Sequence, residues 1–439
     1  MVLLKMTDQK HIYCVHDKLY DLADFVSKHP GGTNVFANLR PLTDITPMIY
    51  TYHKDVSLIF DVLKNYDISE NNMSLVTYNT DYNYDRYKEL KTLVYDEIRS
   101  KGLPLYWSTA EILYNLGGFA AYLGIWVYCF RMAAQNPVSA WWFVLLATIN
   151  IGHCALLFHE TSHYTGFKNQ QLNTLMSHLA VAPVLTTEEW KWDHNYLHHG
   201  FTNTVADPDF NGHQLTFRHS QEHPHYFQHR FQHLYAGALL CLGGFSGQID
   251  SIKHERWNIL LFFGILYWFG FYNTLVFYSL TGFLFLLTAQ LSHIQPECVN
   301  KGEHSCVKGE HSCVKGEHSC VKGEHSCVKG EHSCVKGEHS CVKGEHSHDF
   351  LVNQVASTIN YRTDNIVARY MCFGLDIQIE HHLFPNIPHS TLRQVQYIVR
   401  YYCLNNNVPY IERSDVIEMA KSYWWHLYNM STIISEKNE

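Results

Sequence analysis

Eight histidines and one glutamine follow a spacing that points to metal binding. Three short boxes, HETSH, HNYLHH and QIEHH, carry most of them, and one further histidine lies alone at the end of an apolar stretch. Positions i, i+3 and i+4 share one helix face, so three helix ends could aim their side chains at a common point. Neutral imidazole is a common ligand for iron-type metals, and this set is large enough for two ions. The residues are His159, His163, His194, His198, His199, His293, Gln378, His381 and His382.

Carboxylates stand close to these boxes in the sequence. Glu160, Asp193 and Glu380 are each adjacent to a box histidine, and we expect them to orient imidazoles as hydrogen-bond acceptors. Asp207 and Asp209, in the sequence DPDF, either form a turn or position the second box. The spacing alone does not separate these two interpretations.

A second motif, His29-Pro30-Gly31-Gly32, is followed 24 positions later by His53. Proline fixes the backbone, and two glycines permit a tight turn close to a flat ligand. Two imidazoles on opposite faces of a haem leave no open coordination site, so such a haem transfers electrons and does not bind oxygen. Taken alone, HPGG is equally compatible with a surface turn.

The composition narrows the class of protein. The chain has 439 residues, of which 46% are hydrophobic and 14% aromatic, more than in an average soluble protein. Its net charge of -8 and the lack of a basic cluster argue against a nucleic-acid partner. The N-terminal stretch MVLLKMTDQKHIY is too short and polar for a signal peptide, so we expect a cytosolic N-terminal region with reduced thiols.

Long apolar tracts predict membrane spans. About 20 apolar residues cross a bilayer, and the last tract is long enough for two spans that turn near Asn273. Four spans place both termini and all three boxes on one side of the membrane. The shorter tracts 172–187 and 232–246 suit interfacial or re-entrant helices. The predicted spans are 109–132, 138–158, 257–273 and 274–292.

The remaining segments contain no membrane-length run. In residues 1–80, IYCVHDKLYDL predicts two short strands around a turn at His16-Asp17. Residues 81–108 are rich in charge and predict an amphipathic helical linker. Residues 302–347 repeat the heptad GEHSCVK, with glycine at every seventh position and no apolar a/d pair. We interpret this repeat as a flexible insertion; metal binding by its Cys and His is the alternative.

The two motifs each resemble a known family. Residues 10–80 resemble cytochrome b5 domains, which implies haem b with His29 and His53 as axial ligands and Pro30, Gly31 and Gly32 at its edge. Residues 100–300 and 348–410 resemble the membrane fatty acid desaturases, which hold two irons with H-x3-4-H, H-x2-3-HH and (H/Q)-x2-HH. Gln378 at the start of box three is typical of the front-end desaturases, which also carry a cytochrome b5 domain.

Two details of the boxes depart from the commonest front-end pattern. Box two has three residues between His194 and His198 where many members have two, and is similar to the linoleoyl-desaturase-like branch. Box one has HE where HD is common. The resemblance also implies that His293 is a further iron ligand, with a histidine at the lipid interface as the alternative, and it places Gln378 among the catalytic residues.

The fold implied by the resemblance is an α+β cytochrome b5-like haem domain followed by an all-α integral membrane desaturase domain with four transmembrane helices and a cytosolic di-iron cap. In this division the desaturase domain is split by the repeat. The expected segments are the haem domain 1–80, the linker 81–108, the first desaturase part 109–301, the repeat 302–347 and the C-terminal desaturase part 348–439.

The activity implied is O2-dependent insertion of a cis double bond between the carboxyl end of a polyunsaturated acyl chain and an existing double bond. Δ6 is the first expectation, followed by Δ5 and Δ8. The acyl chain would be carried on CoA or phospholipid in a membrane, expected to be the endoplasmic reticulum, with the boxes facing the cytosol. Electrons would come from NADH through an NADH-cytochrome b5 reductase. A sphingoid-base desaturase, a lipid hydroxylase or a non-catalytic haem- or metal-binding membrane protein are the alternatives.

Overall fold

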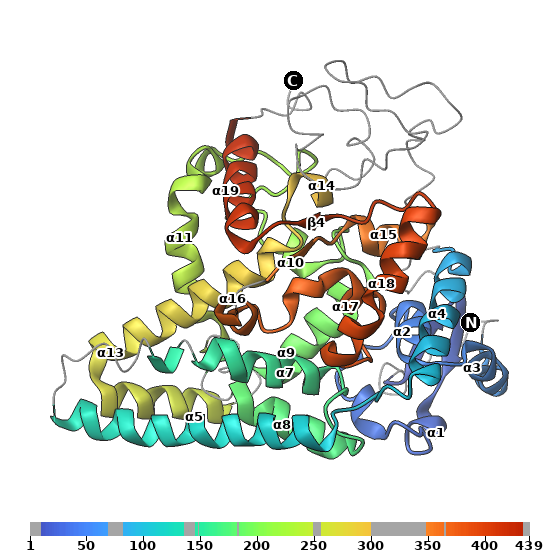
Figure 1. Ribbon diagram of the computed structural model, residues 1–439, viewed down its shortest axis with the longest axis horizontal. Coiled ribbons are helices and arrows are strands. Elements are labelled where there is room, and N and C mark those ends of the chain that lie inside the picture. Colours follow the sequence, from blue (N-terminus) through green and yellow to red (C-terminus); the bar gives the residue numbers. More distant parts are fainter. Residues whose placement is uncertain are drawn as a thin grey trace, which may run out of the picture.

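The computed structural model describes residues 10–68, 82–135, 145–147, 149–181, 184–248, 256–299, 348–363 and 366–432. The chain is mostly helical, with the N-terminal domain at one side of the molecule and the long apolar helices at the other (Figure 1). Residues 138–144 and 148 of the predicted span 138–158, and the whole repeat 302–347, lie outside the described residues.

The N-terminal domain begins with the predicted hairpin. Strands β1 (Ile12–Val15) and β2 (Lys18–Asp21) pair antiparallel. The two turn residues, His16 and Asp17, have φ values of 46° and 59°, as a two-residue hairpin with the right-handed strand twist requires. The hairpin prediction is confirmed. Helices α1 (Ala23–Val26), η2 (Thr33–Phe36), α2 (Thr46–Tyr52), α3 (Val56–Leu63) and η3 (Lys64–Tyr66) complete the domain.

Helix α4 (Asp85–Ser100) has the predicted amphipathic pattern, but it is part of a core rather than a free linker. Its Tyr87, Leu90 and Val94 are fully buried. They share a hydrophobic cluster with residues of α15 (Phe350–Ala356) and α18 (His389–Asn405). The segment that follows the N-terminal domain therefore packs against the C-terminal part of the chain.

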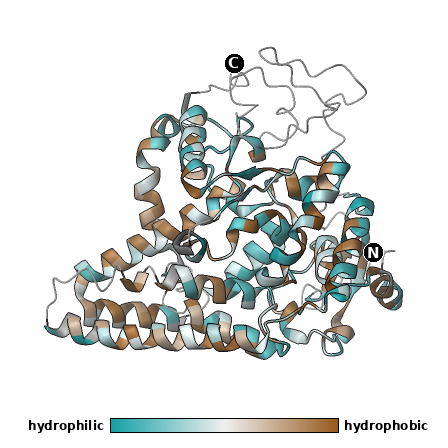
Figure 2. Cartoon of the chain, viewed as in Figure 1, coloured by the Kyte–Doolittle hydropathy of each residue, from teal (hydrophilic) through white to brown (hydrophobic). Residues whose placement is uncertain are grey.

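Two of the described helical segments, Thr109–Cys129 and Asn258–Leu291, are long and apolar enough to cross a membrane. They belong to α5 (Thr109–Gln135) and α13 (Arg256–Leu291), which lie side by side and are rich in hydrophobic residues (Figure 2). Helix α13 changes direction at Gly270, where φ is 75° and ψ is 166°, three residues before Asn273, near which the turn was predicted. This backbone region is almost exclusive to glycine. Four spans remain a prediction.

Shorter helices between these two parts carry the histidine boxes (Figure 1). Box one lies on α7, box two on a π-helix, η6, and box three on α17. The remaining bounds are η5 (Asn150–Cys154), α7 (Ala155–Ser162), α8 (Gln170–Val181), α9 (Thr187–Lys191), η6 (Trp192–His198), α10 (Pro208–Asn211), η7 (Phe227–Phe231), α11 (Gln232–Gly243), α14 (Pro296–Val299), β3 (Asn360–Tyr361), α16 (Ile366–Met371), η10 (Leu375–Ile377), α17 (Gln378–Leu383), β4 (Glu412–Arg413) and α19 (Val416–Thr432).

The N-terminal domain packs directly on the helix that carries box two. Trp192, Tyr196 and Phe201 belong to the same hydrophobic cluster as Tyr13 and Phe36 of the N-terminal domain. The Tyr196 hydroxyl donates a hydrogen bond of 2.5 Å to the carbonyl of Asp44. An ion pair between Arg40 and Glu189, at 2.8 Å, adds a polar contact at the rim. The two halves of the chain are thus joined by a packed interface next to the histidine boxes.

Candidate functional site

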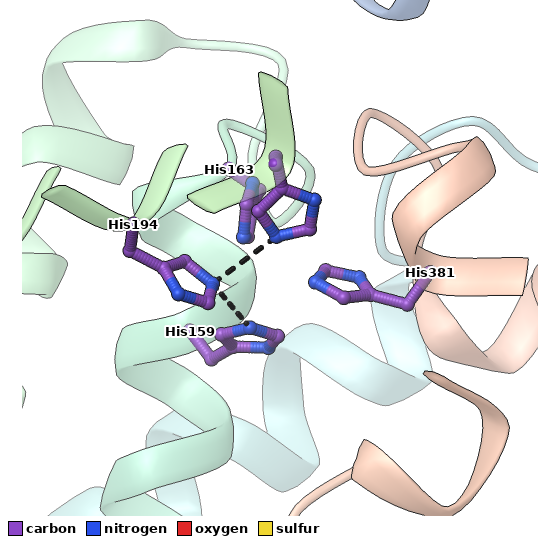
Figure 3. Close-up of side chains that lie close together, drawn as sticks. His159, His163, His194 and His381 are labelled. Carbon is purple, nitrogen blue, oxygen red and sulfur yellow. Dashed lines mark hydrogen bonds between the residues drawn. The ribbon is translucent and has the colours of Figure 1, made fainter. Parts of the chain in front are cut away.

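Five box histidines converge on one point, which we call the first cluster. It consists of His159, His163, His194, His199 and His381, and each offers a ligand atom within 4.8 Å of every other. The Nε2 atom of His194 lies 3.1 Å from that of His159 and 3.2 Å from that of His199. Figure 3 shows the side chains from α7, η6 and α17 facing a shared space.

The other three histidines form a second cluster. His198, His293 and His382 bring their ligand atoms within 4.8 Å of one another, and all three are buried. The side-chain amide of Gln378 lies 3.1 Å from the Nε2 atom of His293. All nine predicted residues are therefore brought together, in two adjacent groups.

The division between the two clusters follows from the π-helix. The backbone N–H of His199 donates to the carbonyl of His194, a bond between residues five apart. The π-helical turn places His194 and His199 in the first cluster and directs His198 into the second. The expectation of plain α-helical spacing is wrong for box two. The additional residue between His194 and His198 is accommodated by the wider turn, and such turns are frequent at functional sites.

A buried carboxylate orients box two. Both oxygens of Asp207 lie close to the Nδ1 atom of His198, at 3.0 and 3.1 Å. The same side chain accepts a hydrogen bond from the backbone N–H of Asp209 and so caps α10. Both interpretations of DPDF are therefore correct for Asp207. The pairing frees Nε2 of His198 for the second cluster.

Two further acceptors fix the rest of the second cluster. The Nδ1 atom of His293 lies 3.1 Å from the backbone carbonyl of Ser357. The Nδ1 atom of His382 lies 3.1 Å from Oε1 of Gln354. In each case one ring nitrogen is held and Nε2 is directed to the cluster, as in metal-ligating histidines. The sequence pattern carries no signal for Ser357 or Gln354, because neither is close to its partner along the chain.

The carboxylates expected to orient box imidazoles have other partners in two cases. Glu160 accepts hydrogen bonds from His389, 2.8 Å from its Nδ1 atom, and from the indole of Trp107. Glu380 accepts from the Asn360 amide and the Tyr410 hydroxyl, each at 2.7 Å. Glu160 thus orients an imidazole as predicted, although it is that of His389 outside the boxes. The prediction is wrong for Glu380, because Asn360 and Tyr410 occupy its carboxylate. The prediction for Asp193 stays a prediction.

His389 is a residue near the site that the spacing did not reveal. Its ring stacks on that of His381, with centres 4.9 Å apart and planes 18° from parallel. It is 6% exposed and held by Glu160. A single histidine after IP has no repeat or helical spacing to distinguish it, so only the folded chain places it here.

Burial controls the charge of the clusters. It lowers the pKa of all five histidines of the first cluster well below the usual value, with neighbouring imidazoles adding to the effect. These rings are neutral at neutral pH, the form that binds metal. For His198, burial lowers the pKa but the carboxylate of Asp207 outweighs it, so the pKa is raised.

The donor set fits two metal ions. Several buried ring nitrogens, among them Nε2 of His163, His381 and His382, have no hydrogen-bond partner. Leaving polar atoms unpaired in the interior is costly, and a cation would satisfy them. Five imidazoles in one group and three imidazoles with a glutamine in the next supply enough ligands for an ion in each. Imidazole-rich sites of this kind suit iron.

A second candidate site is a cavity of about 570 Å³ beside the N-terminal domain. His29 and His53 line it, with ring centres 5.9 Å apart and planes 87° from parallel. Metal–imidazole bonds are about 2 Å long, so this separation leaves room for one ion between the rings. Apolar side chains such as Val35, Met48 and Ile59 form much of the wall.

The orientation and charge of these two histidines also suit ligation. The Nδ1 atom of His53 pairs with the carbonyl of Ile49 at 3.2 Å, which leaves Nε2 for the cavity. Burial lowers the pKa of His29, and lowers that of His53 to about 4, so both are neutral at neutral pH. A Cβ atom on Gly31 would come within 2.8 Å of the His29 ring, which explains the glycine there. The residues fit a flat, apolar group with two axial ligands, as in a haem.

Comparison with known proteins identifies the family. The family model described as fatty acid desaturase matches residues 135–414, which include all three boxes and His293. The chain belongs to the fatty acid desaturase family. No solved structure matches the chain.

Two relatives are similar over nearly the whole chain and a third over about two thirds of it, all at low identity. Delta(8)-fatty-acid desaturase 2 of Arabidopsis thaliana is 24% identical, covering 97% of this chain and 88% of the relative. Acyl-lipid (8-3)-desaturase B of Dictyostelium discoideum is 22% identical, covering 95% and 90%. The sn-1 linoleoyl-lipid 6-desaturase of Synechocystis is 24% identical, covering 65% and 83%.

Proposed function

We propose that the protein is a front-end fatty acyl desaturase that inserts a cis double bond using O2 and electrons from its own haem domain. The main support for this proposal is the pair of clusters, which together contain eight histidines and provide imidazoles for two irons. The names of the relatives support the reaction class. These names give different positions for the double bond, so they leave its position in the product of this protein open. Δ6 remains our first choice, followed by Δ5 and Δ8.

A saturated C–H bond is unreactive, so the reaction needs a strong oxidant. When bound, the irons supply an oxidant derived from O2, and haem b supplies electrons one at a time. Of the four electrons that reduce O2 to two waters, two come from the acyl chain. The other two come from NADH through a cytochrome b5 reductase. The protein's residues hold the two groups in place: His159, His163 and their partners for the irons, and His29 and His53 for the haem.

The substrate and the location follow from the apolar helices. An acyl chain is apolar, and α5 and α13 offer surface suited to lipid, with Leu260 and Phe271 more than 70% exposed. We propose an integral protein of the endoplasmic reticulum membrane with four spans. In this topology the haem domain and both clusters face the cytosol, where the reductase reaches them.

The test is expression in yeast fed with linoleate, followed by gas chromatography of total fatty acids. We expect a new polyunsaturated product whose double-bond position gives the regiochemistry. H159A should abolish it, whereas H178A, which alters a histidine paired with Glu188 away from the clusters, should not. No new fatty acid across several fed substrates would refute the fatty acyl desaturase. Lipidomics of the same cells would then reveal a sphingoid double bond or a hydroxyl group instead.

A further inference from the structure

Tyr52 connects the two candidate cofactor sites. It is the last residue of α2 and directly precedes His53 in the chain. Its hydroxyl lies 2.8 Å from the Nδ1 atom of His163, a member of the first cluster. The two rings are close to parallel, 21° apart, with centres separated by 6.5 Å. Tyr52 thus contacts the imidazole of His163 in the first cluster, and it is joined by a peptide bond to His53, which lines the cavity beside the N-terminal domain.

The chemistry of His163 defines the direction of this hydrogen bond. Its Nε2 atom is buried and has no hydrogen-bond partner, so it is the atom available to a metal. A neutral imidazole that ligates through Nε2 carries its proton on Nδ1 and donates it to an outer acceptor. Tyr52 Oη is that acceptor. The contact therefore links a metal ligand to the N-terminal domain, and does not merely fill space.

The backbone around Tyr52 is held firmly in this position. Lys91 of α4, 4% exposed, donates from Nζ to the carbonyls of Tyr50 and His53. Asn386, which follows box three, donates to the carbonyl of Tyr52 at 3.2 Å. The Lys91 amine and the Asn386 amide thus cap the C-terminal end of α2, where the last carbonyls have no partner within the helix.

We propose that Tyr52 is the contact through which electrons pass from the haem domain to the first cluster. The inference rests on the proposed function, because it assumes a haem in the cavity and iron in the cluster. The route runs from His53 along one peptide unit to Tyr52 and across the hydrogen bond to His163. Each transfer oxidises the ferrous haem to ferric and reduces the iron pair by one electron. NADH, through the reductase, restores the ferrous haem.

A competing route is direct electron transfer from a haem in the cavity to His163, since His163 also lines the cavity. Y52F distinguishes the two routes, because it removes the acceptor of the His163 hydrogen bond and retains the ring. The matched control is Y50F on the same helix. The Tyr50 hydroxyl contacts the Nε2 atom of His16 at 3.0 Å and faces neither the cavity nor a cluster.

The experiment uses the purified full chain, loaded with haem and ferric iron, without oxygen or substrate. A flash-photoreduced flavin gives one electron to the haem, and the decay of the ferrous haem band reports its transfer to iron. Wild-type chain depleted of non-haem iron gives the background. With iron supplied in excess we expect Y52F to hold haem and iron but to slow the decay by about 10- to 100-fold, the order by which loss of an outer-shell partner lowers activity. Y50F should decay at the wild-type rate.

Two outcomes would overturn the proposal. A Y52F protein that transfers electrons at the wild-type rate would show that the direct route suffices. A Y52F protein that loses iron in proportion to its loss of rate would make Tyr52 an orienting residue for His163 only. If Y52F lost haem, Tyr52→Leu, which also lacks an acceptor, would repeat the test. A wild-type chain that binds no haem, or transfers no electron to iron, would instead refute the proposed function.

Discussion

Asp207 illustrates how the second nitrogen of a histidine determines what the first can do. Its fully buried carboxylate accepts a hydrogen bond from the Nδ1–H of His198, so Nε2 of that ring points toward the second cluster. The pairing also stabilises positive charge on that ring. The pKa of His198 is therefore raised, whereas the pKa values of the first-cluster histidines, such as His159, are lowered. His198 therefore differs in electrostatics from its neighbour His382 in the same cluster, whose pKa burial lowers.

D207N should weaken iron binding and activity by about 10- to 100-fold, because an amide is a poorer acceptor than a carboxylate. Asparagine still caps a helix, so α10 should be retained. The measurement is iron per chain after dialysis against a chelator, together with product yield. The control is D415N, since Asp415 caps α19 by accepting from Ile417 and Glu418, far from the clusters in sequence. Equal behaviour of the two variants would contradict the role given to Asp207.

H293A should remove one ion and leave the other. The first cluster has five imidazoles without His293, whereas the second keeps only His198 and His382. We expect metal analysis to find about one non-haem iron per chain in place of about two, with the haem spectrum unchanged. H178A is the control. Retention of both irons by H293A would show that this residue is not a ligand.

The ligand candidates could be predicted from the sequence, but their partners could not. Spacing identifies His159, His163 and the other box residues, because ligands on one helix face repeat at fixed intervals. The acceptors on Ser357 and Gln354 are chosen by tertiary packing, which brings together segments that are distant along the chain. Tyr52 was missed for the same reason: its partner lies 111 positions away.

Helices α13 and η6 show where pattern reasoning about elements succeeds and where it fails. The apolar tract correctly indicated a helical segment too long for one span, and its break was misplaced by three residues. Hydropathy is uniform through the break, so only the conformational freedom of Gly270 marks it. In η6 the additional residue in box two was the visible sign of a π-turn, and α-helical spacing was the wrong template.

G270A should destabilise the fold by about 1–3 kcal/mol, because φ of 75° with ψ of 166° is strained for any residue with a Cβ. Crowding does not contribute, since nothing lies within 4 Å of an added Cβ. Gly264, in the same helix and equally uncrowded, provides the control: G264A should stabilise by roughly 0.5–1 kcal/mol through helix propensity. Thermal unfolding in lipid nanodiscs measures both, and a shift of the same sign in the two variants would contradict the argument.

Across the whole chain, the N-terminal domain and the desaturase part form one continuous structure. Trp192 and Tyr196 of η6, the helix of box two, pack on the N-terminal domain, and α4 lies in the core with α15 and α18. The sequence predicted two units and a linker because composition changes sharply between them. It could not predict the interface, since residues such as Lys91 appear as ordinary surface charges until the fold buries them.

Deleting six of the GEHSCVK copies, 42 residues, should leave iron content, haem content and activity unchanged. The segments on either side of the repeat are fixed independently of it. On one side Asn203 donates to the carbonyl of Cys298, and on the other Asn83 pairs with His348 and Phe350 through the backbone. Product yield in yeast, corrected for expression, checks this. Loss of activity at normal expression would assign the repeat a role.

The pairing of Asn83 with His348 and Phe350 also has a consequence for the number of heptads that the repeat can contain. The described residues on both sides of the repeat are held by hydrogen bonds. For the flexible insertion that the sequence predicts, a change in repeat number would then alter only the entropy of closing a loop between fixed points. That entropy grows with the logarithm of length, about 0.6 kcal/mol for each doubling. Gaining or losing one heptad would cost a small fraction of this amount. On that prediction, chains that differ by one heptad should fold with nearly the same stability.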